Sequence, residues 1–245
     1  MLRAVIFDVD GTLADTERDG HRPSFNAAFA AHALDIVWGV EEYRQLLNIP
    51  GGQRRIAADL RARGFGDRAD ELAAAVHQTK TAMFRERLLD IEPRPGLVDF
   101  VKSLFGAGIR IAVATTGRHA WVAPLVRQLL GEGTVEAIVT GDDVTRLKPN
   151  PEVYRCALAE LGLAPEDVLA VEDSALGLRA ALGAGIATIV VTTDYTAGQD
   201  LTGAAAVRST YGGTEPLSAA LCQRLHRRWW SARDRTVDLP PTDLA

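Results

Sequence analysis

Residues 4–13, AVIFDVDGTL, place four apolar residues directly before two carboxylates, Asp8 and Asp10, and a Gly-Thr turn signal. A short apolar run that ends in a turn is typical of a buried strand in a parallel sheet. Residues two apart in an extended segment share a face, so both carboxylates can point into the same crevice. The stretch therefore predicts a central strand whose carboxyl end carries two acidic groups.

Four further apolar runs have the same character, and each is followed by turn or helix-start residues. The segments between them are long enough to hold crossover helices, as parallel strands require. This alternation predicts an α/β fold, a Rossmann-like open parallel sheet with helices on both faces. The four runs cover residues 109–114, 137–139, 168–171 and 187–191.

A long segment near the N-terminus interrupts this alternation. From Thr16 onward no β-rich run occurs, and Ala, Leu, Arg, Glu and Gln dominate, which predicts an all-helical insert. It ends at residues 93–96, Pro-Arg-Pro-Gly, which cannot continue a helix and suit a boundary. Apolar residues spaced by four from Leu217 to Trp229 predict a terminal amphipathic helix. We therefore expect a catalytic core of residues 1–15 and 92–216, an α-helical cap of residues 16–91, and a terminal helix and tail of residues 217–245.

Composition narrows the class of protein. The 245 residues include 27 Lys and Arg against 32 Asp and Glu, a net charge of −5, so no positive excess is present to neutralise a nucleic acid. The two cysteines, Cys156 and Cys222, are far apart, which fits a reducing compartment. No apolar run approaches a signal peptide or a membrane span. These features predict a cytoplasmic protein without nucleic-acid or membrane partners. A monomer or a weak homo-oligomer is expected, but the composition leaves the oligomeric state open.

Polar side chains follow the other strands too. In open α/β sheets, ligands bind outside the carboxyl ends of the strands. The second strand ends at residues 115–117, Thr-Thr-Gly, the loop after the third carries Lys148, and the fourth ends in Glu172 and Asp173. Carboxylates that converge there would repel each other unless a cation joins them, and oxygen-only ligands point to Mg²⁺. Asp8 and Asp173 are the expected side-chain ligands.

These groups together suit phosphoryl transfer. A carboxylate beside a metal, here Asp8, can act as a nucleophile and form an aspartyl phosphate, while Asp10 donates and later accepts a proton. Lys148 would offset negative charge, and the Thr115 hydroxyl would hold a phosphate oxygen. Each piece alone has a plain structural explanation, such as a turn or a loop dipeptide. Their joint occurrence, in order on successive strand ends, favours a catalytic site.

The same motifs resemble the four signature motifs of the haloacid dehalogenase superfamily, from residue 1 to about residue 210. The helical insert and the run at residues 15–17, Asp-Thr-Glu, resemble its subgroup of β-phosphoglucomutase and the CbbY sugar-bisphosphate phosphatases. The resemblance implies that Asp8 is the nucleophile and Asp10 the general acid/base. It also implies a Mg²⁺ ion held by Asp8, the Asp10 carbonyl and Asp173, with Glu172 next to these ligands.

The resemblance extends into the cap and implies a small phosphorylated sugar as substrate, with xylulose-1,5-bisphosphate as the first candidate. Arg55 would bind the non-reacting phosphate, since a guanidinium fork suits bidentate phosphate recognition. The chain departs from the subgroup at two places. His21 lies one residue later than its counterpart, and Gly117 and Arg118 follow Thr116 where the CbbY phosphatases have other residues. The implied substrate-binding residues are Glu17, His21, Tyr43, Gly51, Arg55, Lys80, Thr116, Gly117 and Arg118.

Two other functions stay open at this point. A sugar phosphomutase would use the same aspartyl phosphate and return the phosphoryl group to a second hydroxyl, and Arg118 is similar to a lysine that β-phosphoglucomutase places near phosphate. A non-catalytic metabolite-binding module would not need a general acid beside a nucleophile, so Asp10 next to Asp8 disfavours it. We therefore expect an enzyme, a phosphoric monoester hydrolase.

Overall fold

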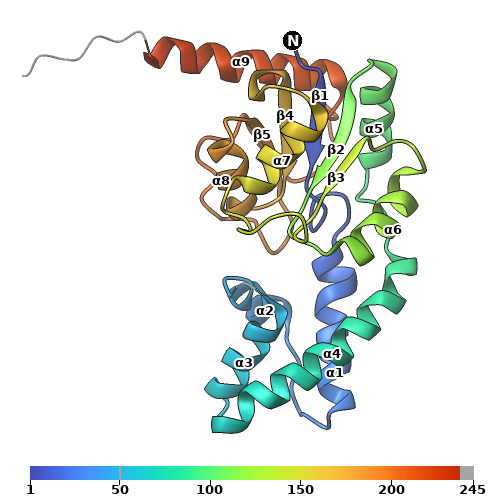
Figure 1. The fold of residues 1–245 in the computed structure, drawn as a ribbon, viewed down its shortest axis with the longest axis vertical. Helices are drawn as coiled ribbons and strands as arrows, with labels where there is room; N and C mark the ends of the chain where they lie inside the picture. The colour runs from blue at the N-terminus through green and yellow to red at the C-terminus, as the bar shows by residue number, and fades with distance from the viewer. Residues whose placement is uncertain (50, 238–245) are drawn as a thin grey trace, which may run out of the picture. The chain divides into compact units, whose positions relative to one another are not determined.

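A six-stranded parallel sheet forms the centre of the computed structural model, which describes residues 1–49 and 51–237. The strand order is β3-β2-β1-β4-β5-β6, and every neighbouring pair is parallel (Figure 1). The open α/β sheet predicted from the apolar runs is thus confirmed. The strands are β1 (Ala4–Phe7), β2 (Arg110–Ala114), β3 (Ala137–Val139), β4 (Val168–Glu172), β5 (Ala187–Val191) and β6 (Ala206–Arg208).

Helices cover both faces of the sheet. Because successive residues of a strand point to opposite faces, Ala4 and Ile6 pack with residues of α7 and α8, while the Phe7 ring packs edge-on against Phe100 of α5. α9 contacts α5 on that second face. These helices and the one after β2 are α5 (Leu97–Gly106), α6 (His119–Leu130), α7 (Glu152–Leu161), α8 (Ala175–Gly183) and α9 (Ala219–Val237).

In residues 14–49 and 51–92, the helical segment contains four α-helices, with a π-helical turn at Glu17–His21 ahead of the first. Its apolar cluster is built on large aromatic side chains, among them Phe25, Phe29 and Trp38, with the Trp38 indole N–H donating to Asp59 Oδ2 (2.9 Å). The four helices are α1 (Arg22–Ala31), α2 (Val40–Leu46), α3 (Gly52–Ala62) and α4 (Ala69–Arg87).

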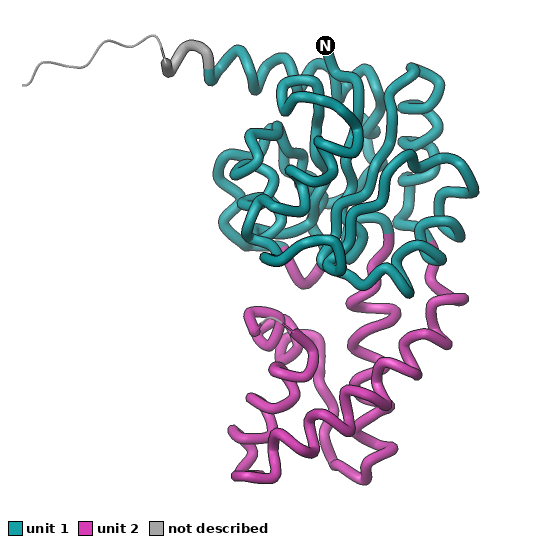
Figure 2. The backbone as a smooth tube through the Cα atoms, in the orientation of Figure 1, with its two compact units in different colours: residues 1–13, 93–193, 197–245 teal, residues 14–92, 194–196 magenta. Residues whose placement is uncertain are grey.

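The chain divides into two compact units (Figure 2). The sheet unit holds residues 1–13, 93–193 and 197–245, and the helical unit holds residues 14–92 and Asp194–Thr196. The last segment has no counterpart in the sequence prediction. It belongs to the helical unit because Tyr195 is buried in that unit's aromatic cluster, with its ring 5.7 Å from that of Tyr43 and its hydroxyl accepting from Arg22 Nε (2.9 Å).

Two local features differ from the sequence prediction. β6 was not predicted, because three residues with a half-exposed pattern carry no continuous apolar run. The terminal helix begins at Ala219, two residues after the first apolar residue of the predicted stripe, Leu217. The tail predicted beyond it, residues 238–245, lies outside the described residues.

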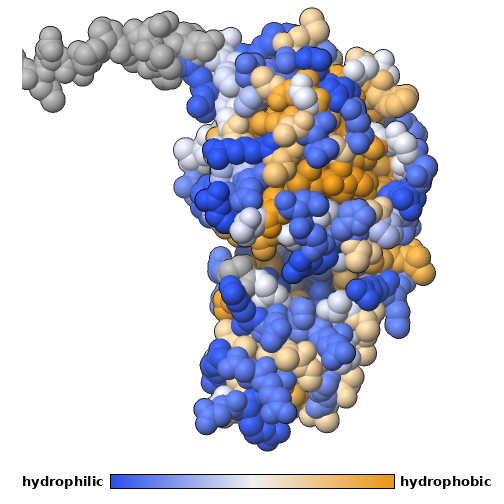
Figure 3. All heavy atoms as spheres, in the orientation of Figure 1, coloured by the Kyte–Doolittle hydropathy of each residue, from blue (hydrophilic) through white to orange (hydrophobic). Residues whose placement is uncertain are grey.

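Apolar residues gather over part of the sheet unit on the face drawn in Figure 3, whereas hydrophilic residues cover much of the rest. The large apolar side chains that are clearly exposed in this unit, such as Phe105, Leu147 and Val207, come from separate elements. Among the described residues, no helix combines the length and the hydropathy needed to cross a lipid bilayer.

Candidate active site

Asp8 is brought to two other acidic residues by the pairing of β1 with β4. Its backbone N–H donates to the Val171 carbonyl (3.0 Å), which continues the parallel register one residue past Phe7. Asp8, Glu172 and Asp173 are all buried, and each offers a carboxylate oxygen within 4.8 Å of the others. The register of the sheet therefore assembles three carboxylates from two strand ends.

Lys148 joins two of these carboxylates. Its ammonium donates to Asp8 Oδ1 (2.6 Å), to Glu172 Oε1 (2.7 Å) and to the Ala114 carbonyl (2.9 Å). These bonds use the three donors that a lysine has. Burial by itself would lower the pKa of Lys148, but the two carboxylates outweigh it and raise the pKa above its usual value, so the group stays protonated.

The charge of the site is unbalanced. Burial raises the pKa of Asp173 well above its usual value, and the neighbouring Asp8 and Glu172 carboxylates raise it further. Burial likewise raises the pKa of Asp8, with Lys148 opposing this shift. One ammonium faces three carboxylates, and a buried set of oxygen donors with excess negative charge fits a hard divalent cation. The residues present thus fit Mg²⁺.

Gly11 closes the loop after β1 against this cluster. Its φ of +77° lies in the left-handed region, and a Cβ added there would come within 2.3 Å of Asp173 Oδ2. A side chain would therefore displace either the loop or the carboxylate. The loop also carries Asp10, which is partly exposed and lies two residues beyond Asp8.

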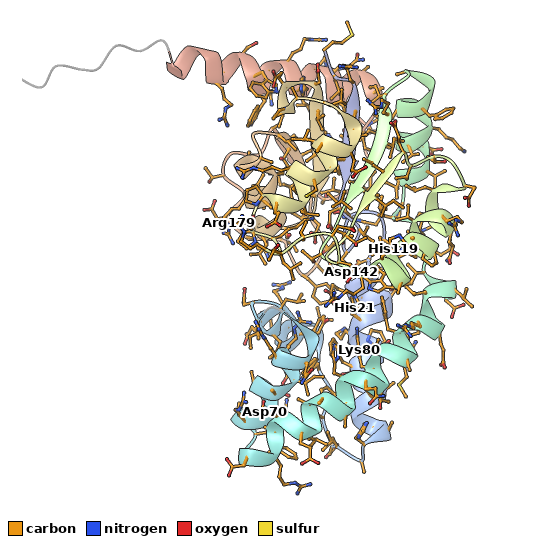
Figure 4. All side chains as sticks on the ribbon, viewed as in Figure 1. His21, Asp70, Lys80, His119, Asp142 and Arg179 are labelled. Atoms are coloured by element: carbon orange, nitrogen blue, oxygen red, sulfur yellow. The ribbon has the colours of Figure 1, made fainter. Side chains whose placement is uncertain are left out.

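The residues after β2 separate into a buried and an exposed group. Thr115 is fully buried, and its Oγ1 accepts from the Gly117 N–H (3.1 Å), which leaves its hydroxyl proton available for an acceptor. Thr116 is exposed. Arg118 is 72% exposed and pairs with Asp142, whose other oxygen accepts from the His119 N–H (2.9 Å). Asp142 and His119 are labelled near each other in Figure 4.

Tyr154 is a member of the buried cluster that the sequence did not single out. Its hydroxyl donates to Glu172 Oε1, and its ring centroid lies 5.1 Å from Lys148 Nζ. Burial raises the pKa of Tyr154, so the hydroxyl keeps its proton and serves as a donor. In the sequence, Tyr154 looks like one more residue on the apolar face of a helix. Only the tertiary structure shows that its hydroxyl reaches Glu172.

In the helical unit, three of the expected substrate-binding residues form a chain of hydrogen bonds. The Tyr43 hydroxyl donates to Glu17 Oε2 (2.5 Å) and accepts from Arg55 (3.2 Å). The buried Arg55 guanidinium also donates to the Leu46 carbonyl (3.0 Å) and, more weakly, to the Ile49 carbonyl (3.4 Å). All of these Arg55 hydrogen bonds are to residues of the helical unit. Gly51, at φ +88°, is the residue that precedes α3.

His21 and Lys80 form a second pair in this unit, close together in Figure 4. Lys80 Nζ donates to His21 Nδ1 (2.7 Å), and the His21 ring stacks on Phe84 (4.0 Å between centroids). Burial, followed by the charge of Lys80, lowers the pKa of His21 to about 3. His21 is therefore neutral when the protein is folded. Because the unfolded chain binds a proton below its ordinary pKa of about 6.5, acidification in this range destabilises the fold.

Comparison with known proteins bears on these arrangements. Residues 2–185 match the family described as haloacid dehalogenase-like hydrolase. The chain belongs to this family. The hydrolase is 45% identical over 209 residues to protein CbbY of Cereibacter sphaeroides, which covers 83% of this chain and 90% of the relative. The expectation of a phosphoric monoester hydrolase in the CbbY and β-phosphoglucomutase subgroup is confirmed.

Solved structures extend the comparison. The hydrolase is similar to a CbbY variant from Rhodobacter sphaeroides in complex with xylulose-1,5-bisphosphate, with a TM-score of 0.77, 41% identity, and coverage of 89% of this chain and 98% of that one. It is also similar to a putative β-phosphoglucomutase from Thermotoga maritima, with a TM-score of 0.67, 28% identity, and coverage of 84% and 94%.

Proposed function

We propose that the protein is a Mg²⁺-dependent phosphatase that hydrolyses a small sugar phosphate or bisphosphate through an aspartyl phosphate on Asp8. The observation that carries the proposal is the buried cluster in which Lys148 bonds to Asp8 and Glu172, with Asp173 beside them. A buried excess of carboxylates lowers the stability of a fold unless a cation binds to it. The presence of such a cluster is therefore typical of a site that binds a cation and acts on a substrate. The similarity to CbbY supports the same conclusion.

The proposed reaction has two steps, in which Asp8 and Asp10 take the roles predicted from the sequence. Asp8 attacks the phosphorus atom while Asp10 gives its proton to the leaving sugar oxygen, and the P–O bond to the sugar breaks. Asp10 then takes a proton from water, which attacks the phosphorus and releases phosphate and the Asp8 carboxylate. Lys148 offsets the charge that gathers on the phosphoryl oxygens, and the Thr115 hydroxyl donates to one of them.

Asp8, the Asp10 carbonyl and Asp173 would hold the metal ion, which supplies positive charge to the phosphoryl group when bound. Glu172 would lie beside these ligands, with its Oε1 accepting from Lys148 and Tyr154. Its role is to hold Lys148 in position.

The leading substrate is xylulose-1,5-bisphosphate, because the similar CbbY structure contains it. Arg55 is the proposed cation for the second phosphate, and Lys80 is a further proposed substrate-binding residue. Both already have partners in the helical unit, so a substrate phosphate would replace the carbonyl partners of Arg55. Further substrate contacts are proposed for Glu17, His21, Tyr43, Gly51, Thr116, Gly117 and Arg118.

The test is phosphate release from a panel of sugar mono- and bisphosphates with Mg²⁺ or with EDTA, using Asp8→Asn as the inactive variant. We expect Mg²⁺-dependent release from a pentulose bisphosphate that Asp8→Asn abolishes. Turnover that persists in Asp8→Asn would refute the mechanism. Isomerised hexose phosphate with little released phosphate, assayed in the same tubes, would establish the mutase function instead.

A further inference from the structure

Arg94 lies at the start of the second segment of the sheet unit, residues 93–193, and its side chain donates to backbone carbonyls. Its guanidinium donates to the Gly11 carbonyl (2.6 Å), to the Val191 carbonyl (2.6 Å) and to the Thr192 carbonyl (2.8 Å), with a longer bond to Ser209 (3.3 Å). The side chain therefore links the loop after β1 to the end of β5. A planar fork with five donors can span acceptors from two chain segments in this way, whereas an ammonium is a single point.

Tyr211 contacts the same loop from the opposite end of the chain. Its hydroxyl donates to the Thr12 carbonyl (3.0 Å), and Arg94 Cζ lies 5.7 Å from its ring centroid. The backbone N–H of Arg94 donates to the Leu13 carbonyl (2.9 Å). Three successive carbonyls, those of Gly11, Thr12 and Leu13, are thus bound by these two residues.

The proposed reaction depends on the position of this loop, because the loop carries Asp10. A Cβ added to Gly11 would overlap the Asp173 carboxylate, and Asp10 directly precedes Gly11. Asp173 therefore limits the loop on one side, and Arg94 and Tyr211 bind its carbonyls. A shift of about 1 Å in a reacting group can cost about 10²-fold in rate. A displacement of this loop would therefore displace Asp10, which adjoins Gly11, relative to Asp8.

We propose that Arg94, together with Tyr211, is a positioning residue that fixes residues 10–13 and thereby aims the Asp10 carboxylate at the leaving oxygen. The inference rests on the proposed function for the role of Asp10, but the placement of the loop is independent of it. Arg94 touches no substrate in this role, so its loss acts on the rate of the chemical step and leaves substrate affinity nearly unchanged.

The experiment compares Arg94→Lys and Tyr211→Phe with Arg228→Lys. Arg228 is a matched control because its guanidinium also donates to a carbonyl of the sheet unit, that of Ala205 (3.3 Å), and none of its contacts among the described residues involves the loop. Steady-state kinetics give kcat and KM for each variant. Hydrogen exchange without substrate follows the Thr12 and Leu13 amides, which donate to the Val9 carbonyl (3.2 and 2.9 Å).

We expect Arg94→Lys to lower kcat by about 10- to 100-fold and Tyr211→Phe by about 3- to 10-fold, with KM changed by less than about threefold. The Thr12 and Leu13 amides should exchange about tenfold faster in both variants, with no change in Arg228→Lys. Unchanged kcat and unchanged exchange in Arg94→Lys and Tyr211→Phe would overturn the proposal. So would a KM that rises with kcat unaltered, or an equal loss in Arg228→Lys.

Failure of the proposed function gives a different result. If the wild-type protein neither releases phosphate from nor isomerises any sugar phosphate of the panel, the proposed function fails, while the exchange rates of Thr12 and Leu13 still decide whether Arg94 and Tyr211 hold the loop.

Discussion

Substitution of Lys148 by methionine tests the buried cluster most directly. Methionine keeps most of the apolar stem, so packing changes little, but three hydrogen bonds are lost, two of them to carboxylates. Removing one partner of a buried ion pair leaves uncompensated charge and costs about 3–5 kcal/mol of unfolding free energy. Because whole domains have about 5–15 kcal/mol, the variant should still fold.

The fall in kcat should be larger than the fraction of unfolded protein in the variant can explain. Lys148 supplies positive charge where the phosphoryl group is transferred, and removal of such a donor lowers kcat by about 10²- to 10³-fold. The assay pairs urea unfolding at pH 8 with phosphate release under conditions in which circular dichroism shows a folded protein. Lys102→Met, on an exposed position of α5, is the control and should change unfolding by less than about 0.5 kcal/mol.

Two results would refute this reasoning. Retention of kcat within about threefold of the wild-type value would show that Lys148 does not act on the reacting group. Equal unfolding free energies for Lys148→Met and Lys102→Met would show that the buried carboxylates do not need the ammonium.

Three further perturbations test other parts of the structure. Tyr154→Phe removes the hydrogen bond to Glu172 and should lower the urea unfolding free energy by about 1–3 kcal/mol, and a value equal to wild type would contradict the placement of the hydroxyl. His21 is neutral in the fold and faces Lys80, Glu17, Arg55 and His77. Acidification from pH 7 to pH 5 should therefore lower the free energy of unfolding by about 2 kcal/mol. His21→Asn should therefore flatten the loss of stability measured by urea unfolding over that range, and an unchanged pH profile would show that His21 is protonated in the fold. Gly11→Ala should abolish Mg²⁺-dependent phosphate release, because its Cβ would overlap Asp173, whereas Gly108→Ala, at φ +68° with no atom within 4 Å of an added Cβ, should lose only stability. Comparable activity in the two alanine variants would argue against the close packing of the loop.

Much of the fold could be predicted from short-range patterns. Apolar runs of three to six residues predict β1 to β5, because strands buried on both faces need continuous apolar sequence. β6 could not be found in this way, since three half-exposed residues depend on pairing with β5 for their conformation.

The predicted core residues also follow from topology, because the carboxyl ends of parallel strands meet at one edge. Asp8, Lys148, Glu172 and Asp173 do lie together in the structure. The predicted substrate residues are less uniform. Arg118 pairs with Asp142 at the surface, and Arg55 donates to carbonyls of its own unit. The residues next to Arg118 and Arg55 in the sequence indicate neither of these partners.

The sequence by itself determined the class of fold, the family and the order of the acidic and basic groups along the strand ends, because periodicity and motif spacing are local properties of a chain. Only the tertiary structure decided which hydrogen-bond partners those groups have. Tyr154 reaches Glu172, Arg94 reaches Gly11, and Asp194–Thr196 join the helical unit across large sequence separations. Such contacts depend on how helices and loops pack, and side chains buried by that packing must find their partners wherever the fold places them.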